Sequence, residues 1–425
     1  MRKYQQLFLV IISLISISVL LMYKSENNRL KYVLQVVNFF GRNDAAVLSR
    51  LENGTKEELT QEFSNPLPVW QRISDDFYLY TAFWEDLDET IGGNAMAVIA
   101  GRKGAIINFK CSFRYENGTE SRGNFVFMPI ASQQTNEKQP EQFAVFKFMC
   151  HIGRDVFPKL GKETPAAVIF TESKSGSKQE VLVHRVNKSA LSKVSNSSVV
   201  ACLNLVPYGN QKPGKHFLKK KNLVQFFMHH QIIGVEDFLV YNGDLVPSEI
   251  KRILSKAGIR VTYFPFNFPF PSKSAKMREI VELDCLMRTF GASKYAVVLD
   301  PNEFIYPNTN FHLKDSVLGW GHYDTNVNRL ALTTFAVCLD YKNKLLVDNN
   351  FYDNDFNVGH KIYIGRSTLH PQNVQSTTLP GSRIFAHHYI NCVSSKDLLY
   401  DWRNFAKEDF MQYIQTIRNE ISFLF

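Results

Sequence analysis

The chain has 425 residues and a mass of 48.9 kDa, which is more than one typical domain and excludes a single small module. With 45% hydrophobic and 21% charged residues it can bury a sizeable core, so the composition excludes a disordered, collagenous or coiled-coil chain. Lys and Arg outnumber Asp and Glu by 49 to 40, and the resulting charge of +9 permits an anionic partner without identifying one.

The amino terminus carries an apolar run, Leu7 to Tyr23, that holds no charged residue. Seventeen residues of helix reach about 25 Å, the short end of what spans a bilayer. A cleaved signal peptide is the alternative, because Ser16-Ile17-Ser18 resembles a cleavage site, but the apolar run continues past it. We expect residues 1–24 to be a cytoplasmic tail and an uncleaved type II membrane anchor, with the rest of the chain in the lumen of the secretory pathway.

Residues 25–75 are mostly polar and are interpreted as a stem. Residues 76–190 contain short apolar runs separated by Gly, Asn and Ser clusters, which predicts a β-rich luminal domain. Four of these runs are Phe77–Tyr80, Met96–Ala100, Ala105–Phe109 and Ala167–Phe170.

The six cysteines include no CxxC pair, which argues against a zinc site. In an oxidising lumen they permit up to three disulfides, and buried free cysteines are the alternative. We expect at least one disulfide among Cys202, Cys285, Cys338 and Cys392. Sequons for N-glycosylation, which are consistent with a luminal location, stand at Asn53, Asn117, Asn187 and Asn196.

From residue 198 to 425 the pattern changes, and strands and helices alternate over its first hundred residues. Strands are predicted at Val199–Val206, Phe238–Tyr241, Ile259–Phe264 and Tyr295–Leu299. Helices are predicted at Phe217–Ile233, Pro247–Ala257 and Ala275–Phe290. Crossovers of this length imply an α/β fold with a parallel sheet, in which ligands bind at the carboxyl ends of the strands.

An acidic turn, Asp300-Pro301-Asn302-Glu303, directly follows the last of these strands. Oxygen ligands at such a position suit Mg²⁺ or Mn²⁺, and a nucleoside diphosphate would complete the coordination shell. The alternative is an acidic turn that only caps the strand.

The strand and its turn resemble the Asp-x-Asp-Glu-Phe element of glycosyltransferase family 92, a group of Golgi-type, galactosyltransferase-like proteins. Other segments are similar to family motifs in the same order: Cys202–Val206, His230–Val235, Phe238–Tyr241, Asp284–Arg288 and His388-Tyr389. The resemblance covers about Val199 to Tyr389. It implies a GT-A fold for residues 198–425, a UDP-sugar donor, Mn²⁺ or Mg²⁺ as the metal, and a type II topology.

Carried over to this chain, the resemblance implies catalytic roles for Asp300 and Glu303: Asp300 would contact the donor's ribose and the metal, and Glu303 would support the turn. Position 302 would supply a direct metal carboxylate, but this chain has Asn302, whose neutral amide brings one negative charge less. His388 is the other candidate metal ligand, and its neighbour His387 would point to the opposite face of a strand.

Asp284 and Arg288 are candidate donor-binding residues; the alternative is that they pair with each other, one helical turn apart. His230, near the end of an apolar helix, is expected to be a core residue. An inverting transfer also needs a carboxylate base. The sequence does not choose among the candidates, which are Asp340, Asp348, Asp353 and Asp355.

Together with the apolar amino terminus, the resemblance implies a membrane-anchored Golgi transferase that moves a hexose, with galactose as the expected sugar, from a UDP-sugar to a hydroxyl of a glycan on a glycoprotein or glycolipid. The alternative is a catalytically inactive family member that binds a luminal glycan or partner, and Asn302 keeps it open. No nucleic-acid partner is expected, because the lysines of residues 212–221 are accompanied by a single aromatic ring, that of Phe217, and not by a series of interleaved aromatic residues.

Overall fold

The computed structural model describes residues 63–86, 92–130, 143–152, 164–185, 198–206, 220–270, 276–307, 313–318, 327–339, 346, 351–353, 361–366, 375–379, 381, 384–390 and 398–400. All of them belong to one compact unit, Thr60–Phe425. The predicted anchor, residues 7–23, and most of the predicted stem lie outside the described residues. Within the described ranges, no helix has the length and apolar character needed to cross a membrane.

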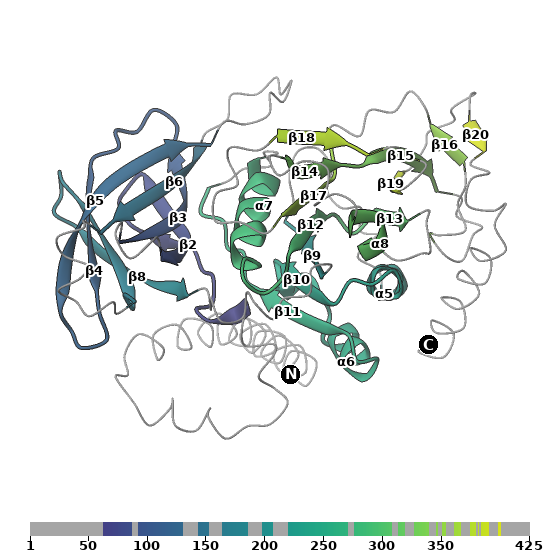
Figure 1. Cartoon of the computed structure of the whole chain (residues 1–425), viewed down its shortest axis with the longest axis horizontal. Helices are drawn as coiled ribbons and strands as arrows, with labels where there is room; N and C mark the ends of the chain where they lie inside the picture. Colours follow the sequence, from purple (N-terminus) through teal and green to yellow (C-terminus); the bar gives the residue numbers. More distant parts are fainter. Residues whose placement is uncertain are drawn as a thin grey trace, which may run out of the picture. The chain divides into compact units, whose positions relative to one another are not determined.

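A first sheet is formed by eight strands in the order β1-β2-β3-β6-β5-β4-β7-β8. The strands are β1 (Gln71–Arg72), β2 (Phe77–Asp86), β3 (Gly93–Arg102), β4 (Phe109–Arg114), β5 (Glu120–Pro129), β6 (Phe143–His151), β7 (Ala167–Glu172) and β8 (Lys178–Arg185). Because β2 also pairs in parallel with β8, strands β2 to β8 close into a ring, seen in purple and blue in Figure 1. The β-rich character was predicted, and the closure of the ring was not.

The interior of the ring is filled by alternate residues of its strands. In β4, for example, Phe109, Cys111 and Phe113 are buried, and the residues between them are more exposed, which is the period of two that a strand imposes. A disulfide joins Cys111 of β4 to Cys150 of β6 inside this core.

Three of the four predicted apolar runs lie within strands β2, β3 and β7, but Ala105–Phe109 lies mostly before β4. The reason is a turn: the Ala105 N–H donates to the Arg102 carbonyl, and Gly104 adopts a φ of 83°. Ile106 beyond this turn is 87% exposed, so its apolar side chain does not mark a strand.

The second sheet contains the predicted alternation of strands and helices. Its parallel strands are β9 (Val199–Asn204), β10 (Asp237–Tyr241), β11 (Arg260–Phe264) and β12 (Tyr295–Leu299), in the order β11-β10-β9-β12. The connecting helices are α5 (Lys220–Ile232), α6 (Ser248–Lys256) and α7 (Lys276–Arg288), and the short η2 (Gly243–Leu245) precedes α6. The predicted parallel sheet is therefore confirmed, with boundaries that differ by three residues or fewer.

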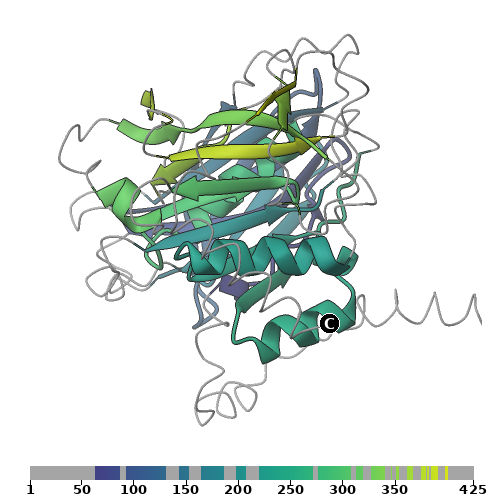
Figure 2. The same ribbon diagram turned by 90° about the vertical axis from the view of Figure 1, so that its right-hand side faces the viewer.

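The two faces of this sheet are covered by different partners. Helices α5 and α6 pack on one face, where the strands contribute Val199, Ala201 and Leu203 to the core. Figure 2 shows these two teal helices together along one side of the strands. Helix α7 packs on the other face together with residues of the first sheet, so that Cys202 and Met96 belong to one shared hydrophobic core.

Beyond β12 the chain extends the second sheet and builds a third. Strands β17 (Tyr363–Arg366), β14 (Val327–Ala331) and β18 (Gln375–Thr378) continue the second sheet after β12. The third sheet has the order β13 (Glu303–Pro307), β19 (Ile384–Ile390), β15 (Thr333–Cys338), β16 (Phe351–Asp353) and β20 (Leu398–Tyr400), and the short helix α8 (Leu313–Leu318) follows β13. The chain is thus a sheet-rich mixture of α and β, and it passes from the second sheet to the third at the acidic turn.

Candidate functional site

The acidic turn lies at the carboxyl end of β12, the edge at which open parallel sheets bind ligands. It closes on itself, because the Glu303 N–H donates to the Asp300 carbonyl (3.0 Å) and the Asp300 N–H donates to Glu303 Oε2 (2.7 Å). The Glu303 side chain is fully buried. Its carboxylate caps the end of the strand, which is the structural role that the sequence left open as an alternative.

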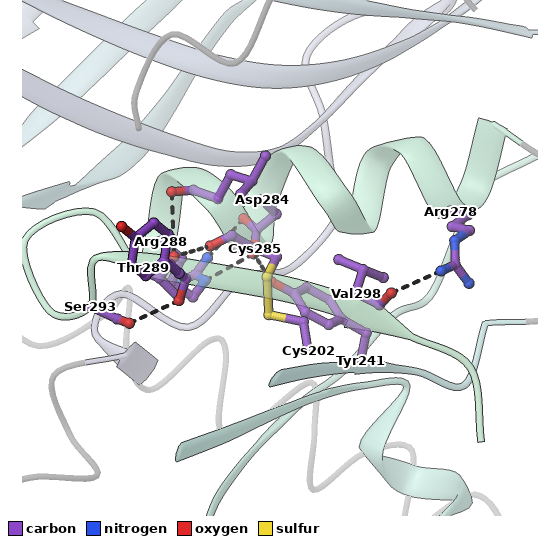
Figure 3. The surroundings of a disulfide bond; sticks show 11 residues. Cys202, Tyr241, Arg278, Asp284, Cys285, Arg288, Thr289, Ser293 and Val298 are labelled. Carbon is purple, nitrogen blue, oxygen red and sulfur yellow. Dashed lines mark hydrogen bonds and ion pairs between the residues drawn. A yellow bond between two sulfur atoms is a disulfide. The ribbon is translucent and has the colours of Figure 1, made fainter. Parts of the chain in front are cut away.

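A cation from the covering helix reaches this turn. Arg278, in the first turn of α7, places Nη1 2.8 Å from Asp300 Oδ1 and Nη2 3.1 Å from Glu303 Oε2. It also donates to the carbonyl oxygen of Val298 at 2.8 Å, as Figure 3 shows. The guanidinium fork therefore ties both carboxylates of the turn to the end of β12.

The neighbouring parallel strand supplies a further contact. Asn204 ends β9, and its Nδ2 donates to Asp300 Oδ1 at 2.9 Å while its Oδ1 accepts from the Val206 N–H at 3.1 Å. The contact follows from the register, because Leu203 of β9 lies opposite Leu299 of β12 and the next residues are Asn204 and Asp300.

Arg278 and Asn204 were not predicted, although the sequence contains a signal for each. Parallel strands end at the same edge of a sheet, so the last residue of one predicted strand lies near the residue that follows its neighbour. A helix that follows a parallel strand begins at that edge, so a basic residue in its first turn lies near the strand ends.

Asn302 and His388 lie together, and they contact each other. Strands β13 and β19 pair with Glu303 opposite His388. Asn302 Nδ2 is 2.9 Å from the Tyr389 carbonyl oxygen and 3.1 Å from His388 Nε2. Because a carbonyl oxygen can only accept, the amide nitrogen must face Tyr389, and it then donates to the ring nitrogen of His388. His388 Nδ1 lies 3.3 Å from Glu303 Oε1, so the proton of a neutral ring sits on that nitrogen.

Two of the atoms predicted to hold Mn²⁺ or Mg²⁺, Asp300 Oδ1 and His388 Nε2, already accept from protein donors and do not fit a divalent cation in this arrangement. Asp300 Oδ1 accepts from Arg278 and Asn204, and the lone pair of His388 Nε2 faces an amide N–H. A divalent ion at the turn would also lie beside a guanidinium of the same sign. Across the described ranges, no three His, Cys, Asp or Glu side chains are grouped to hold a metal.

The histidines around the turn are core residues. His230 donates from Nδ1 to the Phe226 carbonyl (2.8 Å), and its Nε2 accepts from the Ile305 N–H (3.4 Å). Burial lowers the pKa of His230 to about 4, against the opposing effects of the Phe226 carbonyl and Glu303. His387 points to the opposite face of β19 from His388, as predicted, and its ring contacts Tyr306.

Asp284 and Arg288, the predicted donor-binding pair, lie near the other end of α7 and contact each other (Figure 3). Both side chains are 0% exposed, with Arg288 Nε 2.9 Å from Asp284 Oδ2 and Nη2 3.0 Å from Oδ1. The carboxylate also accepts from Thr81 and from Tyr241, each at 2.6 Å, and Arg288 donates to the Phe63 carbonyl at 2.8 Å. This geometry supports the alternative of mutual pairing, and it joins α7 to the first sheet.

Two disulfides are located within the described residues, Cys111–Cys150 and Cys202–Cys285. The second confirms the expectation of a disulfide within the α/β region, and it links β9 to α7 (Figure 3). Of the candidate bases, Asp340, Asp348 and Asp355 lie outside the described residues, and only the backbone of Asp353, in β16, is described.

Comparison with known proteins identifies one family. The sequence model of glycosyltransferase family 92 matches residues 216–360, which include α5, the parallel strands β10 to β12 and the acidic turn. No curated protein matches the sequence.

The solved structures that are similar to this chain include two at 12% identity. One is the 4-diphosphocytidyl-2C-methyl-D-erythritolsynthase from Anaerococcus prevotii DSM 20548, with a TM-score of 0.24 over 53% of this chain and 99% of that one. The other is the amylomaltase from Corynebacterium glutamicum, with a TM-score of 0.14 over 42% of this chain and 22% of that one. At these scores neither similarity supports a statement about fold or function.

Proposed function

Residues 216–360 belong to glycosyltransferase family 92, and from this premise we propose that the chain transfers a hexose, with galactose as the first candidate, from a UDP-sugar to a hydroxyl of a glycan on a glycoprotein or glycolipid. The family match is the observation that carries the proposal. The parallel order β11-β10-β9-β12, with an acidic turn after β12, supports a GT-A fold for residues 198–425.

Asp300 is the residue that we propose to contact the donor. Arg278 and Asn204 hold one of its oxygens, and the side chain is 8% exposed at the ligand-binding edge of the sheet. A carboxylate fixed in this way can accept hydrogen bonds from the ribose hydroxyls. Glu303, which is buried beneath it, keeps the turn in shape and has no contact with the donor in this proposal.

The test is a transfer assay with the full-length chain in detergent, supplied with UDP-hexoses and a panel of glycan acceptors. UDP release and the mass of the acceptor are measured together. We expect UDP release coupled to a gain of one hexose, and a loss of about 100-fold in Asp300→Asn. Asp237→Asn is the matched control, because Asp237 also pairs with an arginine but lies in β10 at the surface. Absence of hexose transfer with every donor would contradict the proposal.

A second function, binding of a luminal glycan or partner without turnover, is favoured by the orientation of Asn302. Its amide faces His388 and Tyr389, where the family motif has an acidic residue. The same assay separates the two functions, since a binding protein would retain UDP-sugar or glycan without releasing UDP.

We propose a type II location in the Golgi lumen. The uncharged run Leu7–Tyr23 and the disulfides, which persist in oxidising compartments, support it. Asn117 lies in an exposed turn in which Thr119 donates to its Oδ1 from both N–H (2.9 Å) and Oγ1 (2.7 Å). We expect Asn117→Gln to remove one glycosidase-sensitive glycan, and Asn108→Gln, an exposed asparagine outside any sequon, to remove none. Unchanged mobility of Asn117→Gln would contradict glycosylation of this turn.

A further inference from the structure

We propose that Arg278 is the resident cation of the acidic turn and that this chain binds its nucleoside diphosphate donor without a divalent metal. The part of the proposal that concerns the donor rests on the proposed function, and the part that concerns the metal does not.

Arg278 is held on three sides. Its guanidinium contacts the Val298 carbonyl at 2.8 Å, Asp300 Oδ1 at 2.8 Å and Glu303 Oε2 at 3.1 Å. The side chain is 9% exposed, and it reaches the turn from α7, which lies over the sheet (Figure 3). A planar guanidinium keeps its charge at every physiological pH, so this cation is permanent.

The charges of the turn are already partly balanced. Asp300 and Glu303 supply two negative charges, Arg278 supplies one positive charge, and Asn302 supplies none. Hard divalent cations bind where carboxylate oxygens face an open position. To reach Asp300 Oδ1, Mn²⁺ would have to displace Arg278 into a buried position without its partner, which is strongly unfavourable. The guanidinium also reduces the repulsion between the turn and a diphosphate, which is one task of the metal in metal-dependent transfer.

Asn302 belongs to the same arrangement. An aspartate with this side-chain orientation would place an oxygen 2.9 Å from the Tyr389 carbonyl oxygen, and two acceptors without a proton between them repel. The amide instead bonds the turn to β19 and occupies the lone pair of His388 Nε2. The neutral Asn302 and the cationic Arg278 therefore act together: both stabilise the turn in a conformation that holds no divalent metal.

The first measurement is a titration of the full-length wild-type chain with Mn²⁺ alone, in which free Mn²⁺ is followed by electron paramagnetic resonance. We expect that the wild type has no Mn²⁺ site that combines a dissociation constant below about 1 mM with loss of binding in Asp300→Asn. A site with a micromolar dissociation constant that is lost in Asp300→Asn and kept in Asp237→Asn would overturn the proposal. This comparison uses the wild-type protein and needs no stable Arg278 variant.

The second measurement asks whether Arg278 is what excludes the metal. Arg278→Met combined with Asn302→Asp is expected to bind Mn²⁺ at least about tenfold more tightly than wild type. Arg260→Met is the matched control. Arg260, the first residue of β11, pairs with Asp237, the first residue of β10, whereas the acidic turn follows the carboxyl end of β12. This substitution should leave Mn²⁺ binding unchanged. A folded double variant, verified by circular dichroism, that gains no affinity would overturn the proposal; if it does not fold, the wild-type titration decides.

The third measurement compares UDP binding in chelator and in saturating Mn²⁺ by calorimetry. We expect dissociation constants that agree within about twofold, and a value about tenfold or more tighter with Mn²⁺ would overturn the proposal. Absence of UDP binding in both conditions would overturn the UDP-sugar donor and with it metal-free donor binding. The Mn²⁺ titration would still test the role of Arg278, so the two failures can be distinguished.

Discussion

Asp284→Asn is expected to lower the free energy of unfolding by about 3 to 5 kcal/mol, because it breaks a fully buried ion pair. The carboxylate accepts four hydrogen bonds, two from Arg288 and one each from Thr81 and Tyr241, at distances of 2.6 to 3.0 Å. The substitution leaves the Arg288 charge without a counter-charge at 0% exposure. One amide N–H₂ group also replaces an oxygen that accepts two of those bonds.

The assay is urea denaturation of the full-length chain at neutral pH without reductant. Thr81→Val removes a single donor to the same carboxylate and should cost less, about 1.5 to 3 kcal/mol. Asp237→Asn makes the same chemical change at a partly exposed ion pair and should cost below about 1 kcal/mol. The double variant Asp284→Leu with Arg288→Met removes both charges, so it should be more stable than Asp284→Asn alone. A cost for Asp284→Asn as small as that of Asp237→Asn would refute the reasoning.

Two further predictions concern stability. Replacing Cys202 and Cys285 together by alanine removes a link between residues 83 positions apart and should cost about 4 kcal/mol, measured without reductant as a lower urea midpoint than that of the wild type. A midpoint equal to that of the oxidised wild type would contradict the link. Burial lowers the pKa of His230 to about 4, so between pH 6.5 and 4 the imidazole is protonated in the unfolded chain and neutral in the folded one. The free energy of unfolding of the wild type should therefore fall as the pH falls through this window, and that of His230→Gln should fall less. Parallel pH profiles of the two proteins would contradict the lowered pKa of His230.

The sequence predicts the α/β region well because its signals are local. Periodicity and length place Tyr295–Leu299 with the same bounds as β12, and four apolar runs separated by helical segments leave few arrangements other than a parallel sheet. The pairing of Asp284 with Arg288 was one of two alternatives, because residues four apart on a helix are neighbours in any case. Local spacing cannot say whether such a pair faces a ligand or a second sheet.

The rest could not be predicted because it depends on contacts between segments far apart in the sequence. The ring of the first sheet closes through Ala82 of β2 and Val183 of β8, and no local pattern records that pairing. In the same way, the composition of the turn suggests a metal site, and only the position of Arg278 shows which cation lies there. A basic residue at the start of a helix is common, so its partner has to be seen in three dimensions.

The shared core between the first sheet and α7 has an evolutionary consequence. The family match begins at residue 216, but the outer face of α7 is buried against Tyr80, Phe83 and Phe143 of the first sheet. A gene fragment that encoded the matched segment alone would produce a protein with that apolar face open to water, prone to aggregate. A change that shortens or exchanges the first sheet would therefore leave this face of α7 uncovered unless the residues of that face changed with it.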